Sequence, residues 1–131
     1  MPDQPTLVET NWLQDNLKND GIAIVDATWY LPNVDATGMQ DYENGHIPGA
    51  VFWDIDRIAD VDTALPHMLP GAIAFEGHMR GLGIANSHHV VVYDNVKMMT
   101  APRVWWMLRA FGHENVSVLN GGLLKWNAEK R

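Results

Sequence analysis

The 131-residue sequence contains no cysteine. This absence excludes disulfide bonds, metal sites built from thiolates, thiol nucleophiles and redox-active cysteine pairs. A reaction that passes through a cysteine-bound sulfur or phosphate therefore cannot be carried out by this chain unaided. Long apolar runs are also absent, because no stretch approaches the roughly 20 apolar residues that a helix needs to span a bilayer.

Basic residues are scarce: nine Lys and Arg stand against 16 Asp and Glu, which gives a net charge of −7. Nucleic acids and anionic membranes are bound by clustered Lys and Arg, so we expect neither as a partner. Residues 1–5 contain neither a basic nor an apolar segment, so we expect no secretory signal, no transit peptide and a cytoplasmic location. The 47% of apolar residues and the chain length predict one globular domain over residues 1–131.

Strand-like and helix-like segments alternate along the chain, which is typical of an α/β domain with a mostly parallel sheet. The pattern predicts strands at 22–26, 50–53, 89–94 and 116–119, and helices at 11–18, 72–82, 102–111 and 123–130, with a single helical turn at 41–44. Thr10 is the expected N-cap of the first helix. Residues 28–38 and 60–70 are expected to be irregular.

Polar side chains follow most of the predicted strands. They are Asp26, Asp54, Asp56, Asp94 and Asn120. Because the carboxyl ends of parallel strands meet at one edge of a sheet, these acids are expected to gather there.

The strongest local signal is a strand that ends at Asp94, followed by the loop 95–100 and a helix that carries Pro102 in its first turn. A tight loop that enters a helix N-terminus directs backbone N–H groups inward and can bind an anion. Either Asp94 itself caps these amides, or the loop holds a separate anionic group. We expect the first arrangement, because Asp commonly caps helix starts.

The histidines give weaker signals. His46 lies in a Gly- and Pro-rich turn and is expected to make a structural hydrogen bond to that turn rather than to act as a base. Asp56 and His67 can form an acid–base pair only if the loop between them folds back. His88 and His89 point to opposite faces of a strand, so we expect no metal site and no cofactor.

Several segments together resemble the rhodanese family. They are Gly45–Ala50, Asp54–Asp56, Leu65–Pro70, Val90–Asp94, Ala101–Arg109 and Gly121–Trp126. More closely, they are similar to the N-terminal domain of tandem-domain thiosulfate/3-mercaptopyruvate sulfurtransferases. The resemblance covers nearly the whole chain and implies a three-layer fold, with a five-stranded parallel sheet flanked by helices.

In such tandem enzymes a cysteine in the C-terminal domain becomes a persulfide and passes its sulfur to an acceptor such as cyanide or a thiol. The resemblance places Asp94 where an active domain carries that cysteine, so it implies an inactive domain without a catalytic residue of its own. The chain departs from the family pattern in lacking the glycines often found in the loop 95–100. It also has Asn120 in place of the usual Asp and Leu124 in place of a common Pro.

The resemblance further implies that Asp56 and His67 assist proton transfer at a cleft between two domains, only when a partner domain is present. The expected partner is a catalytic C-terminal rhodanese domain or, failing that, a second copy of the chain. An exposed apolar face would receive it, with Met68, Met98 and Met99 as candidates.

Two other hypotheses stay open at this point. The chain could be a stand-alone, catalytically inactive rhodanese-like module that binds or regulates a partner through the loop 95–100. Alternatively, it could be an unrelated hydrolase that uses Asp56, His67 and Asp94.

Overall fold

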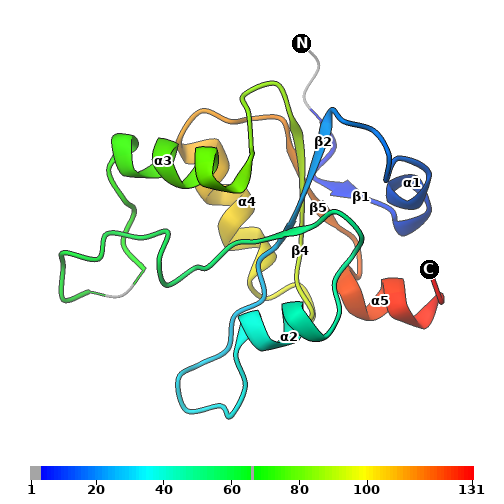
Figure 1. Cartoon of the computed structure of the whole chain (residues 1–131), viewed down its shortest axis with the longest axis horizontal. Helices are drawn as coiled ribbons and strands as arrows, with labels where there is room; N and C mark the ends of the chain where they lie inside the picture. The colour runs from blue at the N-terminus through cyan, green and yellow to red at the C-terminus, as the bar shows by residue number, and fades with distance from the viewer. Residues whose placement is uncertain (1–3, 66) are drawn as a thin grey trace.

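The computed structural model describes residues 4–65 and 67–131 and shows a five-stranded sheet (Figure 1). Its strands are β1 (Leu7–Val8), β2 (Ile22–Asp26), β3 (Val51–Phe52), β4 (His89–Tyr93) and β5 (Val116–Leu119). They lie in the order β1-β5-β4-β2-β3, and every neighbouring pair is parallel. The predicted α/β fold is confirmed, and all five carboxyl ends therefore meet at one edge of the sheet.

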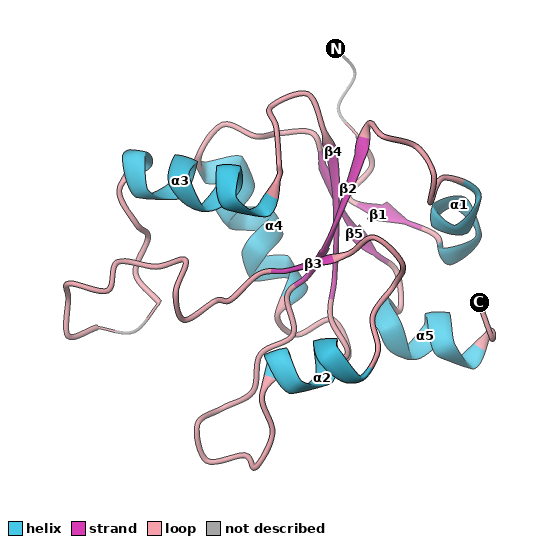
Figure 2. Cartoon of the chain, viewed as in Figure 1, coloured by secondary structure: helices cyan, strands magenta, loops and turns pink. Residues whose placement is uncertain are grey.

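Helices cover both faces of this sheet, which makes the three layers (Figure 2). They are α1 (Thr10–Asp15), α2 (Gly38–Asn44), α3 (Ala72–Leu82), α4 (Ala101–Ala110) and α5 (Gly122–Ala128). Figures 1 and 2 show α3 and α4 on one side of the sheet, with α1 and α5 on the other. Helix α2 lies beyond the ends of the central strands.

The core is divided in two by the alternation of side chains along the central strands. On one face Val25, Val90 and Val92 are fully buried and pack with residues of α3 and α4. On the other face Ile24 and Val91 join a second cluster that includes residues of α1 and α5. Strands β2 and β4 are buried on both faces, which accounts for their continuous apolar sequences.

Two helix starts differ from the predictions. Thr10 was expected to be an N-cap, but Glu9 holds that position, and the Thr10 hydroxyl donates to Glu129 at 2.5 Å instead. Helix α2 is longer than the single predicted turn because Thr37 and Gln40 form a capping box at its start. Both arrangements depend on side-chain partners that apolar periodicity does not report.

The short edge strands also differ. Strand β1 was not predicted, because its two residues are too few to show a pattern.

The end of the first helix differs as well. The helix ends at Asp15 rather than at residue 18, and the side chain of the next residue, Asn16, donates to the carbonyl of Trp12 at 2.8 Å. None of the helices in the described part of the chain has the length and apolarity needed to cross a membrane.

Replacing Gly122 by alanine is expected to destabilise the protein by about 2 kcal/mol. Gly122 has a φ of 60°, and a Cβ there would lie 2.4 Å from the carbonyl oxygen of Asp94. Thermal unfolding followed by circular dichroism measures the effect. The matched control is Gly77→Ala within α3, where a Cβ meets no heavy atom within 4 Å. It should stabilise the helix by roughly 0.5–1 kcal/mol, and equal destabilisation by both substitutions would contradict the assignment.

Candidate functional site

The carboxylate of Asp94, at the end of the central strand β4, is enclosed by the loop that follows it. One oxygen accepts hydrogen bonds from the backbone amides of Val96 and Met98, both at 2.9 Å. The other accepts from the amides of Thr100 at 2.9 Å and Ala101 at 2.7 Å. Asp94 is only 1% exposed. The expectation that Asp94 caps its own loop is confirmed, and the loop forms a cradle for one anionic group.

The shape of this cradle needs unusual backbone conformations. Lys97 and Met98 both have φ values of 62°, in the left-handed region that residues other than glycine seldom adopt. The Met98 sulfur accepts a hydrogen bond from the amide of Gly121, and the Thr100 hydroxyl donates to the carbonyl of Ala27 at 2.7 Å. These contacts, together with the four hydrogen bonds from backbone amides to Asp94, keep the strained loop closed.

Asp56 and His67, which the sequence suggested as an acid–base pair, are in direct contact. His67 Nε2 lies 2.8 Å from Asp56 Oδ1, and the indole N–H of Trp29 donates to the same oxygen at 3.1 Å. The rings of Trp29 and His67 meet edge to face, with centroids 4.9 Å apart. Arg103, from the first turn of α4, donates to the backbone carbonyl of His67. The geometry is that of an imidazole oriented by a carboxylate, which can accept or deliver a proton.

A third cluster connects the cradle to α2, and the sequence did not reveal it. The Tyr30 hydroxyl donates to Asp41 at 2.5 Å, and the side-chain amide of Asn95 donates to the same carboxylate oxygen at 2.9 Å. The hydrogen bond to Asp41 is the main reason why the pKa of Tyr30 is raised to about 12. The Tyr30 hydroxyl also donates to Asn95 Oδ1 at 3.3 Å, so it contacts the first residue of the cradle loop.

The acids at the strand ends do not form one cluster. Asp26 is buried beside Asp94 at the end of the neighbouring strand, and it accepts a hydrogen bond from the amide of Thr28 at 2.9 Å. Burial raises the pKa of Asp26, and the negative charge of Asp94 adds to this. Asp54 instead accepts from the amide of Asp56 at 3.0 Å. The expected gathering of acids thus separates into a buried pair and an exposed turn.

The side chain of Asn120 does not join these acids, because its amide donates to the carboxylate of Glu9. No hydrogen bond among the described residues joins Asp94 to Asp56 or His67. The three residues that the hydrolase hypothesis requires are therefore not assembled into one hydrogen-bonded constellation.

Two further histidines, His46 and His89, occupy structural positions. The ring of His46 stacks on Tyr42, and its Nδ1 lies 2.7 Å from the carbonyl oxygen of Tyr42, in the preceding helix α2. The buried His89 contacts the Ser117 hydroxyl at 2.9 Å. Burial lowers the pKa of His89, so its ring is neutral at pH 7. As expected, His46 makes a structural hydrogen bond.

Two of the three methionines proposed for an exposed apolar face are accessible. Met68 is 46% exposed and Met99 is 77% exposed. The expectation is wrong for Met98, which is partly buried and packs against the core because its sulfur contacts Gly121. The exposed methionines belong to the loop of His67 and to the cradle loop, so both flank the residues described above.

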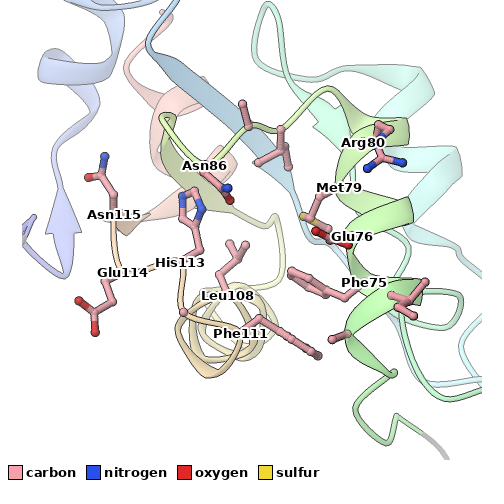
Figure 3. Close-up of a pocket in the computed structure, with 15 residues that line it drawn as sticks. Phe75, Glu76, Met79, Arg80, Asn86, Leu108, Phe111, His113, Glu114 and Asn115 are labelled. Atoms are coloured by element: carbon pink, nitrogen blue, oxygen red, sulfur yellow. The ribbon is translucent and has the colours of Figure 1, made fainter.

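An open groove among the described residues lies away from this site. It encloses about 760 Å³ between α3 and the segment that joins α4 to β5, and Figure 3 shows the side chains that line it. The stacked rings of Phe75 and Phe111, 4.0 Å apart, form part of its wall. The groove is at the amino ends of β4 and β5, whereas Asp94 and its cradle lie at the carboxyl edge. Neither Asp56, His67 nor Asp94 lines it.

A central parallel strand that leads through an amide-lined loop into a helix defines an α/β domain built to hold an anionic group at its carboxyl edge. The chain belongs to the rhodanese-like domain family, whose sequence profile matches residues 9–129.

Individual relatives agree with this assignment. The chain is 48% identical over 122 residues to thiosulfate/3-mercaptopyruvate sulfurtransferase 1, mitochondrial, of Arabidopsis thaliana, covering 93% of this chain and 32% of that protein. It is 46% identical to the 3-mercaptopyruvate sulfurtransferase of Escherichia coli K12, covering 93% of this chain and 44% of the relative.

Among solved structures, SseA from Escherichia coli, a 3-mercaptopyruvate sulfotransferase, superimposes with a TM-score of 0.92 at 43% identity. The match covers 98% of this chain and 49% of that one. The chain therefore spans less than half the length of each of these relatives.

Replacing Asp94 by asparagine should destabilise the protein by about 2–4 kcal/mol, because one oxygen that accepts buried amides becomes an NH₂ group that cannot accept them. Urea unfolding measures the loss. The control is Asp35→Asn at an exposed loop position, which should change the free energy of unfolding by less than about 0.5 kcal/mol. Equal, small effects of both substitutions would show that the carboxylate does not hold the loop.

Replacing Asp26 by asparagine should stabilise the protein at pH 7. The pKa of Asp26 is raised in the folded state. Protonated Asp26 therefore stabilises the fold relative to the charged form. This stabilisation is fully present below the pKa of Asp26 in the unfolded chain and is lost as pH rises through its pKa in the folded protein. Asparagine is uncharged throughout. The advantage of Asp26→Asn in urea unfolding should therefore shrink as pH is lowered from 7 to 4. An advantage that does not vary with pH would contradict this assignment.

Proposed function

We propose that this chain is the cysteine-free, cleft-forming half of a thiosulfate/3-mercaptopyruvate sulfurtransferase and is inactive by itself. The observation that carries the proposal is the carboxylate of Asp94, which fills the amide cradle at the position that the family resemblance assigns to the persulfide cysteine. Residues 1–131 are proposed to form one domain, and its partner a second rhodanese domain that supplies the cysteine.

The chemistry of sulfur transfer supports this division. The group of the enzyme that takes sulfur from the donor must be a thiolate, which then carries the sulfur as a persulfide, and the chain has no thiol. The carboxylate of Asp94 cannot replace one, because both of its oxygens are buried and bound to backbone amides. A domain in this condition contributes a stable framework and a surface for the catalytic domain.

The pair of Asp56 and His67 supplies a proton donor, which a thiolate cannot be. When 3-mercaptopyruvate gives its sulfur to a cysteine, the carbon–sulfur bond breaks, the sulfur–sulfur bond forms, and the carbon that loses sulfur must gain a proton to become pyruvate. An imidazole oriented by a carboxylate is suited to deliver that proton. His67 is accessible for this role, since its side chain is 25% exposed.

The filled cradle argues against a stand-alone module that binds a partner through the amides of the loop 95–100, because Asp94 already accepts from three of those amides and from the amide of Ala101 at the start of α4. The cytoplasmic location remains a prediction, since the relatives include a protein named as mitochondrial.

The test compares this chain alone with the longer protein obtained by following its reading frame past Arg131. Both are assayed for sulfur transfer to cyanide from thiosulfate and from 3-mercaptopyruvate. The isolated chain should match the buffer blank, while a longer protein with a second rhodanese domain should turn over at least one donor. Turnover by the isolated chain well above the blank would overturn the proposal, as would a reading frame without a cysteine-bearing second domain.

A further inference from the structure

We propose that Arg103 is a positioning residue that holds the His67 imidazole against Asp56. This inference deepens the proposed function and rests on it. No hydrogen bond or ion pair among the described residues joins Arg103 to the imidazole or to the Asp56 carboxylate. Its guanidinium donates to the backbone carbonyl of His67, so it acts on the chain that carries the ring.

The backbone of His67 needs such a contact. Its φ is 57°, a left-handed conformation that is unfavourable for a residue with a Cβ. An exposed loop would relax out of this conformation unless neighbouring groups hold it. The hydrogen bond that the carbonyl of His67 accepts from Arg103 acts directly on this strained residue.

The contacts of Trp29 fix the ring rather than the backbone of His67, and the backbone of the next residue is held where the carbonyl of Met68 accepts from the amide of Asp60 at 2.7 Å. Trp29 places its ring edge against the imidazole and donates its indole N–H to Asp56. These contacts come from the segment after β2 and can orient the imidazole only after the loop has brought it there. Arg103 contacts the same loop from a different element, helix α4.

Helix α4 also closes the cradle, because the amide of its first residue, Ala101, donates to Asp94. Arg103 is two residues further along the same helix. The helix thus fixes the proton-transferring pair and the filled cradle in one frame. The Nε atom of Arg103 is buried and has no hydrogen-bond partner among the described residues, so the guanidinium is tied to the loop through its terminal nitrogen.

The first experiment uses the 131-residue chain and nuclear magnetic resonance. Nuclear Overhauser effects between the His67 and Trp29 rings should be present in the parent chain and in Arg109→Ala, and lost in Arg103→Ala. Arg109 is a matched control, because it lies on the same helix but packs over Trp105, with its guanidinium carbon 5.0 Å from the ring centroid. Unchanged effects in a folded Arg103→Ala chain would overturn the inference.

The second experiment uses the longer two-domain protein with 3-mercaptopyruvate as donor. Arg103→Ala should lower kcat by about ten- to a hundredfold, with little change in KM, because the proton donor is displaced while the substrate still binds. In the His67→Ala background, adding Arg103→Ala should cause no further loss. If the losses multiply instead, Arg103 acts independently of His67 and the inference is wrong.

Two further variants keep the test decisive. If Arg103→Ala does not fold, Arg103→Met retains the apolar stem and removes every donor, while Arg103→Lys retains one donor and should recover part of kcat. If His67→Ala leaves turnover unchanged, the proposed proton-transfer role fails, whereas the ring-to-ring measurement still decides whether Arg103 positions His67.

Discussion

The closed loop after β4 depends on one internal ion–amide interaction. Backbone amides that converge at a helix start destabilise the folded state if they are buried without a hydrogen-bond acceptor. Asp94 supplies that acceptor from within the chain, with two amides on each carboxylate oxygen. The left-handed residues in the loop, the packing of Met98 and the start of α4 are all consistent with this one charge.

Because Asp94 occupies the cradle, the polar groups of the domain fall into two sets, one buried and one accessible. The cradle is saturated and buried, so it provides structure rather than reactivity. The accessible polar pair is that of Asp56 and His67, which lie in the segment between β3 and α3, and Arg103 of α4 contacts the backbone of His67. The domain thus separates the anchoring of its loop by Asp94 from the accessible carboxylate–imidazole pair of Asp56 and His67.

Sequence patterns predicted the central strands and α3 and α4 well, because apolar periodicity and turn residues report directly on burial. The capping role of Asp94 was also predictable, since it depends on neighbours in sequence. The contact between Asp56 and His67 required the intervening loop to fold back, which spacing cannot show. Tyr30 and Asp41 were missed for the same reason, because their hydrogen bond joins two segments that each read as irregular or short.

The local errors have a common cause as well. Thr10 has the residue type of an N-cap, but tertiary contact with Glu129 uses its hydroxyl for another purpose. Lys97 and Met98 adopt backbone conformations that favour glycine, and no residue preference reveals this. Both exceptions are stabilised by contacts that exist only after the chain has folded.

The absence of cysteine has a practical consequence for chemical labelling. This chain offers methionine but no cysteine to oxidants and alkylating agents. A reagent specific for thiols therefore leaves it unmodified. In a longer protein of the kind proposed above, the same reagent would label only cysteines outside residues 1–131.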